Sequence, residues 1–249
     1  MSQPSIIIIQ TGTPPEDIRQ NYGDLPDWFS RAIGVPLQEI EVVRVFEGQP
    51  LPAPDNSRLA VITGSWAMVT EKLPWSELTA EWIRQAMAIN MPLFGVCYGH
   101  QLMSYALGGE VRYLDCTRET GCLQVSLNEA ASNDPLVRQL PEHFPAHLTH
   151  MQTVSRLPEG ATVLASSAVD NHQIVRYGPN AISTQFHPEF AVAAAKAMIE
   201  RRSTELDKEG RDSQSLIAGV TQTPDASGLL TRFIALHLNN YDAPAALTA

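Results

Sequence analysis

Residues 92–108 read Pro-Leu-Phe-Gly-Val-Cys-Tyr-Gly-His-Gln-Leu-Met-Ser-Tyr-Ala-Leu-Gly, an apolar strand that passes through a G-x-C-x-G turn into an apolar helix. This order is typical of a nucleophile elbow, in which a sharp turn lifts one side chain above the edge of a sheet. Gly95 and Gly99 lie two residues either side of Cys97 and allow neighbouring elements to approach closely. The spacing alone fits a catalytic thiol and a buried structural cysteine equally well.

Three apolar runs before this stretch also predict strands, at residues 5–10, 40–46 and 58–63. The first contains four consecutive isoleucines, a pattern typical of a strand that is buried on both faces of a parallel sheet. We expect a helix to start near Thr13, which offers a capping hydroxyl ahead of two prolines. An amphipathic segment, 75–90, separates the third run from the strand at 92–96. Strands that alternate with helices predict a doubly wound, mostly parallel α/β sheet flanked by helices.

The second half of the chain changes character. Short alternating runs between residues 111 and 182 predict antiparallel strands that extend one side of the same sheet. Residues 191–209 have a helical composition, and Gly210 follows them as a candidate C-cap. Residues 213–223 give no clear pattern, and a last helix is expected over 229–238.

The length of 249 residues suits one large domain, because single cores usually stop growing near ~250–300 residues. No internal repeat or long linker divides the sequence. We therefore expect a single domain over 1–249, with its core at about 5–190 and a helical C-terminal extension at about 191–240.

The formal net charge of −10 argues against nucleic acid or an anionic membrane surface as the main partner. The N-terminal residues lack the features of a signal peptide, and no run approaches the ~20 apolar residues that span a bilayer. Three cysteines are too few and odd in number for a disulfide framework, and the spacing of Cys116 and Cys122 does not match a zinc site. We expect a cytoplasmic protein without a metal or a cofactor.

Residues 181–189, Ala-Ile-Ser-Thr-Gln-Phe-His-Pro-Glu, predict a strand that ends near His187, with Glu189 two residues further on. A thiol nucleophile needs a base, and that imidazole needs a carboxylate to fix its tautomer. Cys97, His187 and Glu189 can fill these three roles. A satisfied core histidine and a helix N-terminal acid are the alternative interpretations of the last two.

A third segment, residues 61–66, reads Val-Ile-Thr-Gly-Ser-Trp and predicts a strand that ends at Gly64. Ligands gather at the C-terminal ends of strands in a doubly wound sheet. The backbone N–H groups of Gly64 and Tyr98 could then face one developing oxyanion, where each donor is worth about 3–4 kcal/mol in acyl transfer. An ordinary strand-to-loop turn is the alternative.

Together, and in this order, the three segments resemble the class I (triad) glutamine amidotransferase family over about residues 6–190, and in particular free-standing proteins similar to the glutaminase domain of GMP synthetase. Residues 118–121, Arg-Glu-Thr-Gly, and 149–154, Thr-His-Met-Gln-Thr-Val, resemble further family elements. One departure is Gln152, which stands where many relatives carry Asp. The resemblance implies a flavodoxin-like fold.

The resemblance also implies a mechanism. Cys97 would attack the γ-carbonyl of a glutaminyl group and form a γ-glutamyl thioester, while the amides of Gly64 and Tyr98 hold the oxyanion. His187 would pass a proton to the departing ammonia, Glu189 would orient His187, and water would then release glutamate.

Substrate contacts are implied for Gln101 and for the backbone near Met151 and Gln152. Glu119 and His150 match motif positions, but we assign them no chemical role.

Four functions can be considered from the sequence, of which a different elbow-cysteine hydrolase of similar sheet topology is disfavoured by the His-Pro-Glu sequence of residues 187–189. The first is glutamine hydrolysis that supplies ammonia to a separate synthetase subunit, since the chain contains no phosphate loop or pyrophosphatase loop of a synthetase. The second is a free-standing γ-glutamyl peptidase or hydrolase. The Gly64-Ser65 loop followed by residues 73–75, Leu-Pro-Trp, also resembles free-standing relatives with that activity. The third is a non-catalytic regulatory module, against which the complete set of Cys97, His187 and Glu189 argues.

Overall fold

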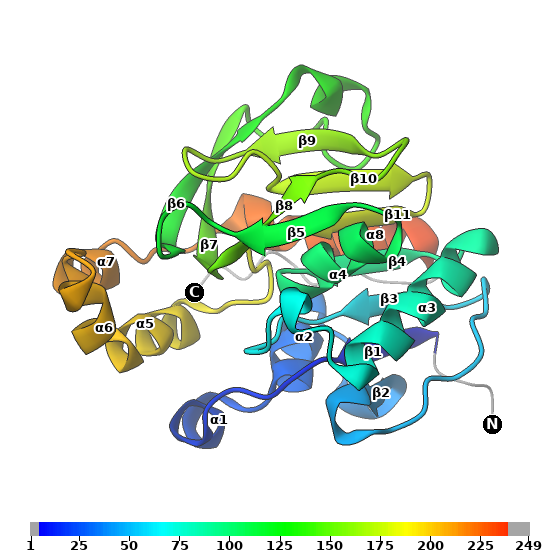
Figure 1. Cartoon of the computed structure of the whole chain (residues 1–249), viewed down its shortest axis with the longest axis horizontal. Coiled ribbons are helices and arrows are strands. Elements are labelled where there is room, and N and C mark those ends of the chain that lie inside the picture. Colours follow the sequence, from blue (N-terminus) through cyan, green and yellow to red (C-terminus); the bar gives the residue numbers. More distant parts are fainter. Residues whose placement is uncertain (1–4, 239–249) are drawn as a thin grey trace.

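The computed structural model describes residues 5–238, and most of its strands form one nine-stranded sheet in the order β2-β1-β3-β4-β11-β10-β9-β6-β7 (Figure 1). In chain order these strands are β1 (Ile6–Gln10), β2 (Ile40–Arg44), β3 (Leu59–Ile62), β4 (Leu93–Val96), β6 (Glu119–Leu127), β7 (His143–His150), β9 (Thr162–Ser166), β10 (Ile174–Gly178) and β11 (Ala181–Thr184). The five strands from β2 to β11 pair in parallel, and the remaining pairs are antiparallel. The prediction of a mostly parallel sheet with an antiparallel extension is confirmed.

Two further strands, β5 (Glu110–Tyr113) and β8 (Gln152–Arg156), pair with each other in antiparallel orientation and form a second, two-stranded sheet. The helices that complete the described fold are α1 (Glu16–Tyr22), α2 (Leu25–Ile33), α3 (Pro74–Ala88), α4 (Tyr98–Ala106), α5 (Val192–Arg201), α6 (Ser203–Lys208), α7 (Ser213–Ala218) and α8 (Pro224–His237). No helix within residues 5–238 is long and apolar enough to cross a membrane.

The isoleucine run of β1 explains why helices cover both faces of the sheet. Ile6 and Ile8 pack in the cluster that α2 and α8 cover, whereas Ile7 and Ile9 pack in the cluster that α3 and α4 cover. All four side chains are buried, because successive residues of a strand point to opposite faces. The continuous apolar pattern therefore reports a strand with a core on each side, as predicted.

The first helices begin differently from the expectation. Thr13 does not cap a helix: α1 starts at Glu16 after Pro15 without a side-chain cap, and the Thr13 hydroxyl donates to Asp24 at 2.9 Å. Asp24 instead caps α2, and the side chain of Asp27 accepts from the Asp24 backbone N–H at 2.8 Å in a capping box. The side-chain cap therefore belongs to α2, where Asp24 accepts from the backbone N–H of Leu25, and the Thr13 hydroxyl is bonded to this same Asp24.

The C-terminal extension also differs from the expectation. The helical composition of residues 191–209 corresponds to two helices, because the backbone at Arg202 (φ −103°, ψ 8°) leaves the helical conformation between α5 and α6. Gly210 adopts a left-handed conformation (φ 76°) directly after this pair, in agreement with its expected role as a terminator. The last helix, α8, begins at Pro224 and therefore earlier than predicted.

The extension returns to the central core. The Phe233 ring of α8 packs edge-on against Phe94 of β4, with ring centroids 5.2 Å apart. We propose on this basis that the chain forms one domain; residues 1–4 and 239–249 of the expected span 1–249 lie outside the described residues. The short helices α5, α6 and α7 gather at one side of the molecule, where they contact α1 and β6 (Figure 1).

Replacing Gly99 by alanine tests the close contact between α4 and β3. A Cβ atom at Gly99 would lie 2.4 Å from the carbonyl oxygen of Ile62, so we expect Gly99→Ala to lower the free energy of unfolding by about 3 kcal/mol. Urea denaturation of both proteins measures this difference. Gly178→Ala serves as the control, because the nearest atom to its added Cβ is the methyl of Met87 at 3.9 Å. Equal losses in the two variants would contradict the proposed contact.

Candidate active site

Cys97 occupies the sharp turn between β4 and α4. Its backbone has φ 51° and ψ −99°, a left-handed region that a residue with a side chain rarely adopts. Added Cβ atoms at Gly95 and Gly99 would clash with backbone and side-chain atoms at 2.7 and 2.4 Å, so both glycines are needed for the close packing around the turn. The elbow predicted from the sequence is therefore present.

His187 follows β11 and lies beside Cys97. The backbone N–H of His187 donates to the carbonyl of His147 at 2.9 Å, and the Nδ1 atom lies 2.7 Å from Oε1 of Glu189. The imidazole ring stacks on Phe190, with centroids 4.1 Å apart and planes 18° from parallel. Glu189 thus fixes the edge of the ring that points away from Cys97, and Phe190 fixes its plane.

The charges around His187 favour its protonated form. Burial lowers the pKa of the imidazole, but the negative charges of Glu189 and Cys97 outweigh burial and raise the pKa to about 10. The Nε2 atom is buried and has no hydrogen-bond partner within residues 5–238. The ring can therefore hold a proton at neutral pH and present it to a group next to Cys97.

Gly64 lies against both of these side chains. A Cβ atom at this position would be 3.1 Å from Cε1 of His187 and 3.6 Å from Cβ of Cys97. The peptide group that supplies the Gly64 N–H is held by its carbonyl, which belongs to Thr63 and accepts from Gly99 N–H at 3.1 Å and from Thr11 Oγ1 at 3.0 Å. Because N–H and C=O point in opposite directions across a trans peptide, these bonds also set the direction of the N–H.

The second amide expected near Cys97 belongs to Tyr98. Tyr98 is the first residue of α4, and amides in the first turn of a helix have no acceptor within the helix. Its side chain points away from the site: the phenol donates to Ser76 at 2.6 Å, and burial raises the pKa of Tyr98 to about 12. The residue therefore offers only its backbone to the site.

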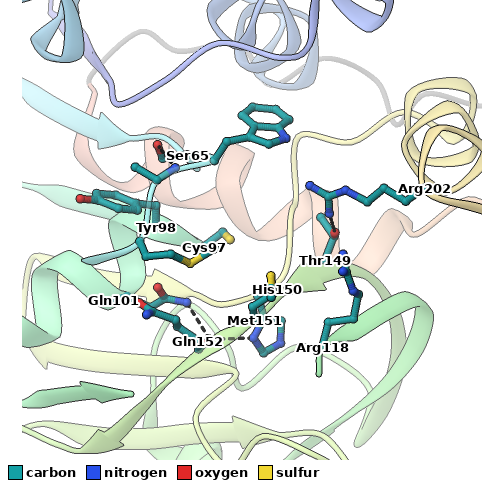
Figure 2. Close-up of a pocket in the computed structure, with 13 residues that line it drawn as sticks. Ser65, Cys97, Tyr98, Gln101, Arg118, Thr149, His150, Met151, Gln152 and Arg202 are labelled. Carbon is teal, nitrogen blue, oxygen red and sulfur yellow. Dashed lines mark hydrogen bonds between the residues drawn. The ribbon is translucent and has the colours of Figure 1, made fainter. Parts of the chain in front are cut away.

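The expected substrate residues line a pocket that opens beside Cys97 (Figure 2). Gln101 is anchored, because its Nε2 atom donates to the carbonyl of Gln152 at 2.8 Å and to the side chain of Gln185 at 2.9 Å. The amide nitrogen of Gln152 donates to Thr70 at 2.6 Å, while its Oε1 atom is buried without a partner in the described part of the chain. Met151, between His150 and Gln152, also lines this pocket.

His150 of the pocket lining forms a buried pair with Glu119. The Nε2 atom of His150 lies 2.9 Å from Oε2 of Glu119, and Nδ1 lies 2.9 Å from the carbonyl of Gln152. Glu119 also accepts from Ser167 at 2.6 Å and from Gln173 at 3.0 Å. Through His150, the pair holds the backbone carbonyl of Gln152 in place.

Two arginines in the pocket wall were missed by sequence reasoning. Arg118 comes from the start of the β6 segment and Arg202 from the junction of α5 and α6, and both line the pocket with Thr149 (Figure 2). Arg118 is the first residue of the segment 118–121 quoted above, but no role was predicted for it. Arg202 lies in the extension, where no sequence pattern indicated a contact with the site.

A second, smaller pocket adjoins the first on the side of His187. The two pockets share Cys97, Ser65, Trp66, Thr149 and Arg202. The second pocket is also lined by Gly64 and His187, and by the apolar side chains of Leu25, Phe190 and Met198. Cys97 therefore lies between two spaces, one next to Gln101 and the other next to His187.

Comparisons with known proteins agree with this geometry. The family model of glutamine amidotransferase class I matches residues 38–205. The glutamine amidotransferase-like protein YfeJ of Salmonella typhimurium is 34% identical over 178 residues, which cover 68% of this chain and 72% of YfeJ. The γ-glutamyl-L-1-hydroxyisopropylamide hydrolase of a Pseudomonas species is 32% identical over 167 residues, which cover 65% of this chain but only 56% of that protein.

A solved glutamine amidotransferase from Thermotoga maritima superimposes with a TM-score of 0.75 at 23% identity and covers 95% of this chain and 99% of its own. At this identity the structural match supports the fold alone, while the family model spans most of the sequence. The chain belongs to the class I glutamine amidotransferase family.

Proposed function

We propose that the protein hydrolyses γ-glutamyl amide bonds through a thioester on Cys97. The observation that carries this proposal is the strained elbow that holds Cys97 beside the buried His187–Glu189 pair. The thiolate sulfur attacks the γ-carbonyl carbon, and the carbonyl oxygen becomes an oxyanion. When the oxyanion collapses, the C–N bond breaks, His187 gives its proton to the leaving amine, and the glutamyl group stays on sulfur.

The second half of the reaction returns the enzyme to its starting state. Water attacks the thioester carbon, and His187, now neutral, takes a proton from that water. Collapse of the new oxyanion breaks the C–S bond and releases glutamate and the thiolate. Glu189 supports both halves, because it holds the ring by Nδ1 and stabilises its cationic form.

The backbone amides of Gly64 and Tyr98 are the proposed donors to both oxyanions. Gly64 lies beside Cys97 and His187, and Tyr98 directly follows Cys97 at the start of α4. Neither donor requires a side-chain movement, so the stabilisation is preorganised.

Two substrate classes fit this chemistry. Glutamine is the simplest γ-glutamyl amide, and its ammonia could pass to an acceptor on a separate synthetase subunit. Larger γ-glutamyl amides and peptides are the second candidate. The second pocket favours them, because Leu25, Trp66, Phe190 and Met198 line a space beside His187 in which ammonia alone would contact little.

Replacing Cys97 by serine tests the nucleophile. We expect Cys97→Ser to reduce glutamate release from glutamine and γ-glutamylglycine by about 10³-fold or more, because a hydroxyl is far less readily ionised than a thiol. Rapid acid quenching followed by peptide mass spectrometry should detect a glutamyl adduct on the peptide that contains Cys97.

The matched control is Cys116→Ser, since Cys116 is an exposed thiol outside both pockets. We expect it to retain full activity and the adduct. Full activity in Cys97→Ser, or an adduct that depends on Cys116, would contradict the mechanism.

Replacing Glu189 by glutamine tests the charge on His187. In the wild type, the raised pKa of about 10 keeps the ring protonated at pH 7 and the proton leaves only in the alkaline range. Loss of the Glu189 charge should lower the pKa, so the ring loses its proton at a lower pH. We also expect hydrolysis to fall by about 10²–10⁴-fold.

The titration is measured by proton–nitrogen NMR of histidine-labelled protein, with His187 assigned from the His187→Asn variant. Glu200→Gln removes an exposed carboxylate from α5 and should leave the titration unchanged. If Glu189→Gln leaves the pKa of His187 unchanged, the proposed role of Glu189 is wrong.

A further inference from the structure

Arg202 places a positive charge at the junction of the two pockets. It lies where the backbone breaks between α5 and α6, and its side chain lines the space beside Gln101 as well as the space beside His187. Its Nη1 atom donates to the hydroxyl of Thr149 at 3.0 Å. Within residues 5–238, no carboxylate oxygen lies at ion-pair distance from this guanidinium.

Arg118, the other arginine of the wall, is already neutralised. Its Nη2 atom lies 2.9 Å from Glu209 and 3.5 Å from Glu205, and its Nε atom donates to both carboxylate oxygens of Glu209 at 3.1 Å. The contrast is informative, because Glu205 of α6 and Glu209 directly after that helix supply two carboxylates to Arg118, and neither lies at ion-pair distance from Arg202. The pocket therefore contains one paired cation and one whose charge is available to a ligand.

The surroundings of Arg202 make an incoming anion favourable. Burial lowers the pKa of the guanidinium and the nearby charge of Arg118 lowers it further, while the negative charges of Glu205 and Cys97 oppose this shift in part. An arginine remains charged at neutral pH. A partly buried cation of this kind gains most from a carboxylate, which a guanidinium can bind with two parallel hydrogen bonds. The hydroxyl of Thr149 fixes one end of the guanidinium and leaves its other donors for that purpose.

The position of Arg202 indicates which end of the substrate it meets. Figure 2 shows Gln101 and Gln152 on one side of Cys97 and Arg202 with Thr149 on the opposite side. Under the proposed function, the glutamyl group extends from Cys97 towards Gln101. The leaving amine must then lie towards His187, which donates its proton, and Arg202 lines that second pocket too.

We infer that the preferred substrates are γ-glutamyl amino acids or peptides whose leaving amine carries a carboxylate, and that Arg202 binds this carboxylate. This inference rests on the proposed function, because it assigns the direction of the substrate from Cys97 and His187. The leaving group would pack against Trp66 and Phe190 and extend its carboxylate to Arg202. Glutamine releases ammonia and has no group that could reach Arg202 from this side.

Binding to a catalytically inactive protein separates this inference from the hydrolysis itself. In the Cys97→Ala protein, isothermal titration calorimetry compares γ-glutamylglycine with γ-glutamylglycinamide, which differ only in the terminal carboxylate. We expect the acid to bind about 10–100-fold more tightly than the amide, as is typical of a hydrogen-bonded charge pair. Adding Arg202→Met should abolish this preference, leave the affinity for glutamine unchanged, and be partly rescued by Arg202→Lys.

Arg201→Met is the matched control, because Arg201 is the neighbouring residue but forms an exposed ion pair with Asp17 at 3.0 Å. It should leave the preference for the acid intact. The inference is overturned if the acid and the amide bind equally, if γ-glutamylglycine does not bind, or if Arg202→Met weakens glutamine as much as the peptide. The last result would place Arg202 on the glutamyl end or in a structural role.

The two proposals can fail separately. A tenfold preference for the acid that depends on Arg202, in a protein whose wild type releases no glutamate from any of these compounds, would support the carboxylate site and contradict the hydrolysis. Glutamate release from both γ-glutamylglycine and its amide at equal kcat/KM, with Cys97 labelled, would support the hydrolysis and overturn the carboxylate site.

Discussion

One backbone hydrogen bond joins the two halves of the site: the N–H of Cys97 donates to the carbonyl of Thr184 at 2.8 Å. This bond continues the parallel pairing of β4 with β11 past the last residue of β4. Cys97 and His187 are ninety residues apart in sequence, yet they follow directly or closely on neighbouring strands. Their separation is therefore set by the spacing of a sheet, about 4.8 Å between strands, and not by long flexible loops.

Motifs that depend on local backbone geometry could be predicted from the sequence. Cys97 requires a strand, a tight turn and a helix in succession, and His187 requires a strand end, so both leave a pattern in a few neighbouring residues. The isoleucines of β1 report their burial on both faces in the same way. Features that depend on distant contacts left no such pattern: the cap of α2 at Asp24 and the position of Arg202 both follow from how segments meet in three dimensions.

The distribution of charge around Cys97 is asymmetric. On one side Glu189 stabilises the protonated form of His187, and on the other Glu205 and Glu209 form ion pairs with Arg118 but not with Arg202. The protein has a formal net charge of −10, so the positive groups that face the pocket are an exception to its overall acidity. The positive groups at the site therefore favour an anionic ligand there, although the protein as a whole is acidic.

The proposed bond cleavage and the proposed selectivity for the leaving group are carried by different elements of the fold. The groups proposed for bond cleavage sit on or next to β3, β4 and β11, inside the sheet, where a change in backbone position would disturb both cores. The proposed selectivity for the leaving group depends on Arg202, at the junction of α5 and α6, and these helices lie outside that sheet. Insertions, deletions and substitutions in these helices can therefore redirect the enzyme to a different leaving group during evolution while the catalytic apparatus stays intact.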